Sequence, residues 1–172
     1  VGLENCHGVS RLVTMRNCVS DGASTHFAGV LFCRADNEGL RDLGDLRGRR
    51  LAAVSQSSFG GWQMARREAL RHGIDLAADC RVHFAGTHDA VVYRVLRGEA
   101  DAGTVRSDTL ERMAQEGKID LAAIRLLAGR DRGDGLAVLH STPAYPEWPL
   151  AKLRHTDAEL ASQVAAALLR MP

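Results

Sequence analysis

The chain has 172 residues and a formal net charge of +1; 45% of its residues are apolar and 25% are charged. This length and composition are typical of one globular domain or two small lobes, and they exclude a disordered chain. The lack of a dense basic run argues against nucleic acid as a partner, and no segment reaches the run of about 20 apolar residues that spans a bilayer.

The first half of the sequence alternates short apolar runs with polar turns, which predicts strands separated by loops and helices. The elements expected there are a strand over 11–15, a polar loop over 17–26, a strand over 27–34, a helical turn over 40–46, a strand over 49–54 and a helix over 60–72. The turn between the last two elements is rich in hydroxyls and glycines.

The second half continues the same alternation. The elements expected there are a strand over 81–85, a helix from 87 to 97, strand 100–105, helix 107–116, strand 121–127, strand 135–140 and a final helix. Thr156 and Glu159 have the spacing of a capping box for that helix, and Leu160, Val164 and Leu168 form one stripe on it. This β-α-β order predicts an α/β fold with a mostly parallel sheet and flanking helices.

In such a sheet the ligand site lies where strands end and helices begin. The first candidates follow strand 49–54, where a helix start offers backbone N–H groups to an anion. They are Ser57, Ser58, Phe59, Gly60 and Gly61. The serines also suit a plain helix cap, and that alternative stays open. Two glycines directly after them favour close ligand approach, because a cap alone does not need them.

Two further polar strand ends are expected at the same edge. Thr87 and His88 open the second helix, and Thr104 and Arg106 end the strand that follows it. Imidazole can donate to an oxyanion, and guanidinium can clamp one through two N–H groups. The alternatives are a capping or surface role for His88, a plain strand position for Thr104, and an ion pair of Arg106 with Asp101 or Asp108.

The cysteines and histidines show no metal-ligand spacing, and neither a metal nor a cofactor is expected. Cys6 and Cys18 are close enough in sequence for a disulfide in an oxidising compartment, and this option stays open. Cys33 and Cys80 fall within apolar strand patterns and are expected to be buried thiols.

Several motifs carry a family resemblance. Residues 45–52 (Asp-Leu-Arg-Gly-Arg-Arg-Leu-Ala) resemble the entry to the second lobe of type II periplasmic binding proteins. The Ser/Gly turn, 84–90 (Phe-Ala-Gly-Thr-His-Asp-Ala) and 98–103 (Gly-Glu-Ala-Asp-Ala-Gly) resemble the phosphate- and phosphonate-binding branch. Segments 58–62, 103–113 and 145–149 (Tyr-Pro-Glu-Trp-Pro) are similar to the sensor region of tetrathionate-type sensor histidine kinases.

The resemblance implies a complete second lobe over 45–128 and a partial first lobe formed by 1–34 and 136–172. Segments 35–44 and 129–135 would then be hinges or connectors. In the related binding proteins a Ser-Thr-Ser-Gly turn holds the phosphonate. Here Ser58-Phe59-Gly60-Gly61 replaces it, so phosphonate specificity is not carried over.

The function implied is a non-catalytic, extracytoplasmic sensor domain that binds a small oxyanion or polar solute between two lobes. Its partners would be that ligand and a membrane-anchored kinase core in the parent protein, which places the domain in the periplasm. Self-association, such as a homodimer, is expected because a partial lobe leaves apolar surface uncovered. The alternatives are a solute-binding protein of an ABC transporter and a small hydrolase or transferase that uses Ser58 and His88.

Overall fold

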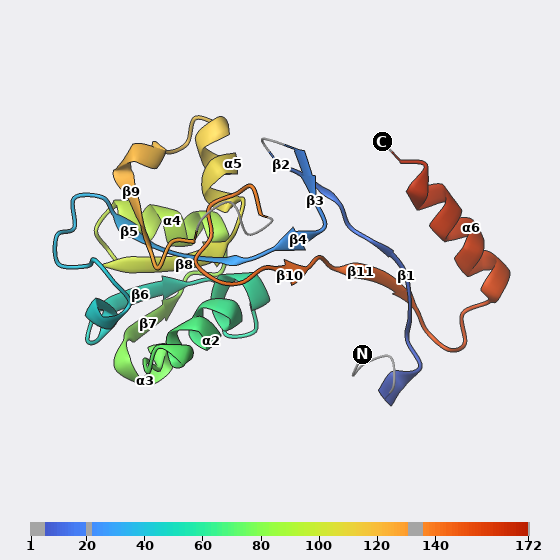
Figure 1. Cartoon of the computed structure of the whole chain (residues 1–172), viewed down its shortest axis with the longest axis horizontal. Coiled ribbons are helices and arrows are strands. Elements are labelled where there is room, and N and C mark those ends of the chain that lie inside the picture. The colour runs from blue at the N-terminus through green and yellow to red at the C-terminus, as the bar shows by residue number, and fades with distance from the viewer. Residues whose placement is uncertain (1–5, 20–21, 131–135, 172) are drawn as a thin grey trace.

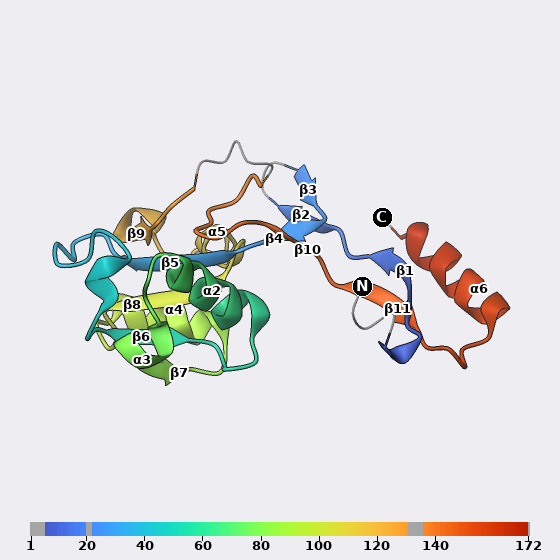
Figure 2. The same cartoon turned by 60° about the horizontal axis from the view of Figure 1, so that its bottom comes forward.

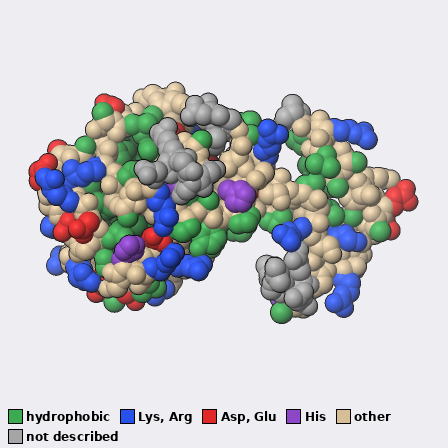
Figure 3. All heavy atoms as spheres, in the orientation of Figure 1, with side chains coloured by type: hydrophobic (Ala, Val, Ile, Leu, Met, Phe, Trp, Pro, Cys, Tyr) green, Lys and Arg blue, Asp and Glu red, His purple; other side chains and the backbone are tan. Residues whose placement is uncertain are grey.

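The computed structural model of the chain describes residues 6–19, 22–130 and 136–171, which form a larger body and a smaller arm (Figure 1). The arm consists of β1 (Ser10–Thr14), β11 (Pro149–Lys152) and α6 (Ala158–Leu169). In the space-filling view the molecule narrows between the body and the arm (Figure 3). Every predicted site residue belongs to the body, so the fold of the body positions the site.

The body is built on one sheet with the strand order β7-β6-β8-β5-β9. The strands are β5 (Gly29–Arg34), β6 (Arg50–Ala53), β7 (Arg81–Phe84), β8 (Ala102–Arg106) and β9 (Ile124–Leu127). Strand β6 pairs in parallel with β7 and β8, whereas β5 pairs antiparallel with β8 and β9. The α/β class is confirmed. The sheet is mixed because β5 enters from the arm and not through a βα crossover.

Helices cover both faces of this sheet (Figure 2). On one face lie α2 (Met64–Arg71) and α3 (Leu76–Asp79), and on the other lie α4 (His88–Leu96) and α5 (Thr109–Gln115). Short helical turns precede several elements: η1 (Gly44–Leu46), η2 (Phe59–Gln63) and η3 (Leu121–Ala123). Alternate residues of the strands point to the two faces, which gives the body two apolar cores.

Two stretches of chain run side by side between the body and the arm (Figure 1). We call residues 15–19 and 22–28 the first connector and residues 143–148 the second connector. Within them β4 (His26–Phe27) pairs antiparallel with β10 (Tyr145–Pro146), and β1 pairs antiparallel with β11 further out. The predicted polar loop over 17–26 contains a hairpin, β2 (Asn17–Val19) and β3 (Gly22–Ser24).

The strand predicted over 135–140 is absent from its described part, residues 136–140. Two apolar side chains of this segment are buried and alternate as a strand would, which explains the wrong prediction. The neighbouring part of β5 is bonded by a side chain instead, because the N–H of Leu31 donates to Oγ of Ser141 at 2.9 Å. The backbone N–H of Ser141 also donates to the carbonyl of Gly29 at 2.9 Å, so groups of the next residues, and not a strand over 136–140, bond β5 at this place.

Helix α6 begins at a different cap from the predicted one. Asp157, and not Thr156, is the N-cap, since its carboxylate accepts from the N–H of Leu160 at 2.9 Å. Two residues of the predicted stripe, Leu160 and Val164, are 53% and 37% exposed. The apolar stripe of α6 is therefore largely open to solvent on the described chain.

The predicted lobe boundaries stay a prediction. The segment 45–128 carries β6 to β9, while β5, from the segment 1–34, pairs within the same sheet. Residues 35–44 lead from β5 to η1 inside the body, and 131–135 lie outside the described residues. Among the helices that are described, none combines the length and hydropathy that crossing a bilayer needs.

Candidate functional site

Eight of the nine predicted site residues follow one of three neighbouring strands of the sheet or end it, and the ninth, Thr104, lies within the third strand. Strand β6 leads to η2, β7 leads to α4, and β8 ends at Arg106. Because these strands run in parallel, both helix starts lie at the carboxyl edge of the sheet, where they contact β8. The connectors also reach the body at this edge, since Gly29 at the start of β5 pairs with Arg106.

The serines are placed differently. Ser58 is the N-cap of η2, and its Oγ accepts from the N–H of Gly61 at 3.1 Å. Ser57 is exposed, with its Oγ 3.4 Å from Oγ of Ser55. A hydroxyl that accepts a capping bond keeps its own proton as a donor. Capping and contact with an anion are therefore compatible at Ser58.

Both glycines after the serines are buried. A Cβ on Gly61 would lie 2.4 Å from Cγ2 of Val54, and a Cβ on Gly60 would lie 3.1 Å from Cβ of Arg106. From sequence these glycines were expected to allow close approach of a ligand. Their positions supply a packing reason, because η2 approaches β6 and β8 more closely than a side chain permits.

The start of α4 brings a histidine against β8. Thr87 caps this helix, with its Oγ1 accepting from the N–H of Ala90 at 3.2 Å. Nδ1 of His88 accepts from the backbone N–H of Arg106 at 3.2 Å. Burial, and after it the charge of Arg106, lowers the pKa of His88 below its ordinary value. At neutral pH the ring is uncharged and carries its proton on Nε2, where it can donate to a ligand.

Thr104 lies in the middle of β8 and pairs with Leu31. Its side chain is fully buried, and its Oγ1 has no hydrogen-bond partner. Thr104 is thus a buried strand residue, and its contact with a ligand stays a prediction.

Arg106 is already paired with acidic side chains. Its Nη1 donates to Oε2 of Glu147 at 3.2 Å, its Nη2 donates to Oε1 of the same carboxylate, and its Nε lies 3.5 Å from Oδ1 of Asp108. The guanidinium also stacks on Phe27, with Cζ 4.3 Å from the ring centroid. Of the two ion pairs considered from sequence, only the one with Asp108 forms, because Asp101 binds Arg50.

Asp108 has a backbone φ of +73°, in the left-handed region that non-glycine residues rarely adopt. Burial raises the pKa of its carboxyl group, and the charge of Arg106 opposes that rise. Arg106 therefore lies between two carboxylates, of which that of Glu147 is fully buried and that of Asp108 is partly buried.

Sequence reasoning did not assign Glu147 and three aromatic residues to the site. The ring of Phe59 lies 5.2 Å from that of Tyr145, 6.0 Å from that of Phe27 and 6.2 Å from that of Trp148. The segment 145–149 packs on the body, since the ring of Tyr145 contacts that of Phe59. The density of aromatic and proline residues in that segment was the signal that it is a fixed, contacting element.

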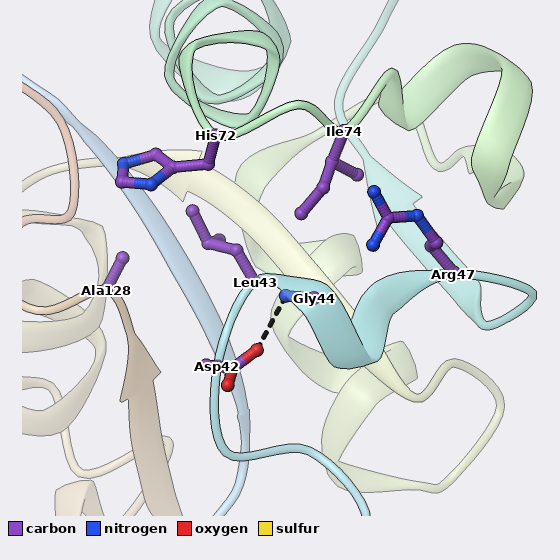
Figure 4. A pocket seen from close by; sticks show the side chains of 7 residues that line it. All are labelled: Asp42, Leu43, Gly44, Arg47, His72, Ile74 and Ala128. Carbon is purple, nitrogen blue, oxygen red and sulfur yellow. Dashed lines mark hydrogen bonds between the residues drawn. The ribbon is translucent and has the colours of Figure 1, made fainter.

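A cavity of about 310 Å³ lies elsewhere on the body (Figure 4). Its lining residues are Asp42, Leu43, Gly44, Arg47, His72, Ile74 and Ala128. Its polar side chains are engaged within the protein: Asp42 accepts from Gly44 at 2.6 Å and Arg47 donates to the carbonyl of Gly73 at 2.9 Å. None of the predicted site residues lines it.

The described cysteines are all free thiols. Cys6 and Cys18 are both exposed, and no disulfide joins them in this structure. Cys80 donates from its Sγ to the carbonyl of Leu46 at 3.2 Å, and burial raises its pKa to about 11.

Comparisons with known proteins agree with this architecture. The profile of the ABC transporter, phosphonate, periplasmic substrate-binding protein family matches residues 1–172. The tetrathionate sensor histidine kinase TtrS of Salmonella typhimurium is 30% identical over 171 residues, which are 98% of this chain and 28% of that protein. The chain thus spans less than a third of this relative.

Solved structures show the same fold. XAC2383 from Xanthomonas citri bound to ATP matches with a TM-score of 0.67 at 20% identity, over 94% of this chain and 57% of its own. PhnD1 from Prochlorococcus marinus in complex with methylphosphonate matches with a TM-score of 0.64 at 16% identity, over 92% and 57%. The periplasmic VFT2 domain of Bordetella pertussis BvgS matches with a TM-score of 0.52 at 21% identity, over 99% and 58%. The chain has the type II periplasmic-binding-protein fold and belongs to the phosphonate-type periplasmic substrate-binding protein family.

Proposed function

We propose that this chain is the extracytoplasmic ligand-binding region of a two-component sensor histidine kinase, and that it binds a small oxyanion. The observation that carries the proposal is the 30% identity to a tetrathionate sensor histidine kinase along 98% of the chain. The membrane anchor, the kinase core and the periplasmic location belong to the proposal, because the chain spans only 28% of that relative.

The chemistry of the carboxyl edge supports an oxyanion as ligand. The N–H groups in the first turn of a helix have no partner within the helix, and the dipole there favours negative charge. The hydroxyl protons of Ser58 and Thr87 and the Nε2 proton of His88 add donors beside them. Sulfate, phosphate, phosphonate and sulfonate groups, including the two ends of tetrathionate, offer the matching acceptors.

The second candidate is a solute-binding protein of an ABC transporter for phosphonate- or phosphate-like anions, favoured by the family profile. A kinase core in the protein that carries this chain would decide against it.

The hydrolase alternative gains no support from the described residues, because Ser58 accepts from Gly61 while Nδ1 of His88 accepts from Arg106. Neither hydrogen bond joins the hydroxyl of Ser58 to the imidazole of His88, which is the nucleophile–base contact that such an enzyme needs.

The proposed site is tested at Ser58 in the protein that carries this chain, by calorimetric titration with tetrathionate, sulfate, phosphate and methylphosphonate. Ser58→Asp keeps a good N-cap but adds a negative charge at the helix start, so we expect unchanged stability and at least tenfold weaker anion binding. Ser58→Ala removes the cap at a cost of about 1 kcal/mol and also weakens binding. Undiminished binding by Ser58→Asp would place the anion elsewhere.

Self-association remains a prediction. The exposed residues Leu160 and Val164 on α6 supply apolar surface for it, and sedimentation velocity at micromolar concentrations measures it directly. A monomer at all concentrations would contradict the predicted homodimer without affecting the ligand site.

A further inference from the structure

The carboxylate of Glu147 occupies Arg106 in the way that a bound oxyanion would. Both terminal nitrogens of the guanidinium donate to the two carboxylate oxygens. This two-point geometry is the one that guanidinium uses for carboxylate, phosphate and sulfonate groups alike. A ligand anion that reaches Arg106 must therefore compete with the carboxylate of Glu147 for the guanidinium.

Glu147 belongs to the second connector and not to the body. Its N–H donates to the carbonyl of Thr25 in the first connector at 2.8 Å, and Nδ2 of Asn17, also in the first connector, donates to its Oε1. One carboxylate thus joins three parts of the molecule: β8 of the body and both connectors to the arm. Figure 1 shows these connectors as the bridge between the body and the arm.

The two partners differ in their access to solvent. The side chain of Glu147 is 0% exposed, whereas that of Arg106 is 18% exposed. An anion from solution can approach Arg106, while Glu147 survives in the interior only through its donors. If an anion takes the guanidinium, the carboxylate loses its charged partner and can no longer stay buried at low cost.

Resting on the function proposed above, we propose that Glu147 is an internal competitor for the ligand and a positioning residue for the connectors. The oxyanion exchanges with the carboxylate of Glu147 on Arg106, and Glu147 moves away with the second connector. Arg106 stays paired throughout the exchange, and no covalent bond changes. The movement reaches the arm because β11 and α6 follow Glu147 directly along the chain.

Trp148 makes this exchange measurable. It comes directly after Glu147, and its ring lies 6.0 Å from that of Phe27 and 6.2 Å from that of Phe59. The chain contains two tryptophans, and the other, Trp62, is buried in the core under α2. In a Trp62→Phe background, Trp148 reports the environment of the second connector alone.

The test uses Glu147→Gln, which keeps the shape of the side chain and one acceptor oxygen but removes the charge. Tetrathionate, sulfate and methylphosphonate are titrated by calorimetry against the wild-type protein and this variant. We expect the variant to bind the anion at least fivefold tighter, because the competing carboxylate is gone. Its Trp148 emission, in the Trp62→Phe background, should match without anion what the wild type reaches when saturated.

Asp101→Asn is the matched control, because Asp101 forms a similar two-point ion pair with Arg50 away from the site. It should lower stability without changing anion affinity or Trp148 emission. If the wild type binds an anion and Glu147→Gln binds it no tighter, Glu147 has only a structural role and this inference is wrong. The proposed function would still stand in that case. If no anion binds to either protein, both fail.

Discussion

The backbone N–H of Arg106 donates to Nδ1 of His88 at 3.2 Å, and this hydrogen bond ties the end of β8 to the start of α4. It exists only while Nδ1 carries no proton, since a protonated imidazole has no acceptor. The bond therefore links the protonation of one side chain to the position of two elements at the carboxyl edge.

This relationship predicts a pH dependence of stability. The pKa of His88 is lowered in the folded protein by burial, by Arg106 and by Arg112, with Asp89 opposing. Stability from His88 is thus fully present above its unfolded pKa near 6.5 and is lost as the pH falls through the lower folded value. Urea unfolding of the wild type and His88→Gln between pH 5 and 8 measures it. The variant should lose less stability on acidification, and equal slopes would contradict the prediction.

Gly61→Ala is expected to destabilise the fold by about 1–3 kcal/mol, since the added Cβ would lie 2.4 Å from Cγ2 of Val54. Denaturant unfolding of Gly61→Ala, Val54→Ala and the double variant gives the coupling between the two sites. We expect the double variant to be more stable than the sum of the single effects predicts. Additive losses would mean that the glycine is needed for another reason, such as ligand approach.

The carboxyl edge could be predicted from sequence because its signals are local. A buried strand followed by Ser58 and two glycines specifies strand, cap and helix within a dozen residues. The same holds for Thr87 and His88, which were expected to open a helix because they precede an apolar helical pattern, and Thr87 is the N-cap of that helix. Short-range patterns of this kind indicated the candidate site, which stays a prediction, and gave the order of the elements around it.

The partner of Arg106 could not be predicted in this way. Glu147 is 41 residues away along the chain, and only the return of the second connector beside the first places it there. Sequence reasoning considered Asp101 and Asp108 because they are near in sequence. In the fold Asp101 pairs with Arg50 instead. Asp101 directly precedes β8 and Arg50 begins β6, so both lie at the edge of the sheet that is away from the site.

Thr104→Val tests whether the hydroxyl of Thr104 serves the ligand or is merely buried. Its Oγ1 is enclosed without a hydrogen-bond partner, so replacing it with a methyl group of similar size should stabilise the fold by about 1 kcal/mol. Thr104→Ser, which keeps the hydroxyl and loses the methyl, should destabilise it. Thermal unfolding measures both changes. Weaker anion binding by Thr104→Val would support the ligand role predicted from sequence, and unchanged binding would contradict it.

Of the four thiols, two are expected to react rapidly with a thiol reagent and two slowly. The thiolate is the reacting species, so a buried thiol with a raised pKa reacts slowly. Cys6 and Cys18 are exposed, Cys33 is fully buried, and burial raises the pKa of Cys80 to about 11. A disulfide reagent at pH 7.5 should therefore modify two thiols per chain rapidly under native conditions and all four in denaturant.

The identity of the fast thiols is checked with Cys6→Ser and Cys18→Ser, each of which should remove one fast equivalent. Cys80→Ser is the control and should leave both in place. Fewer than two fast thiols in the unreduced wild type, restored by a reductant, would mean that Cys6 and Cys18 pair in solution. That outcome would tie the β2–β3 hairpin to the residues before β1, and it would make the first connector sensitive to the redox state of its surroundings.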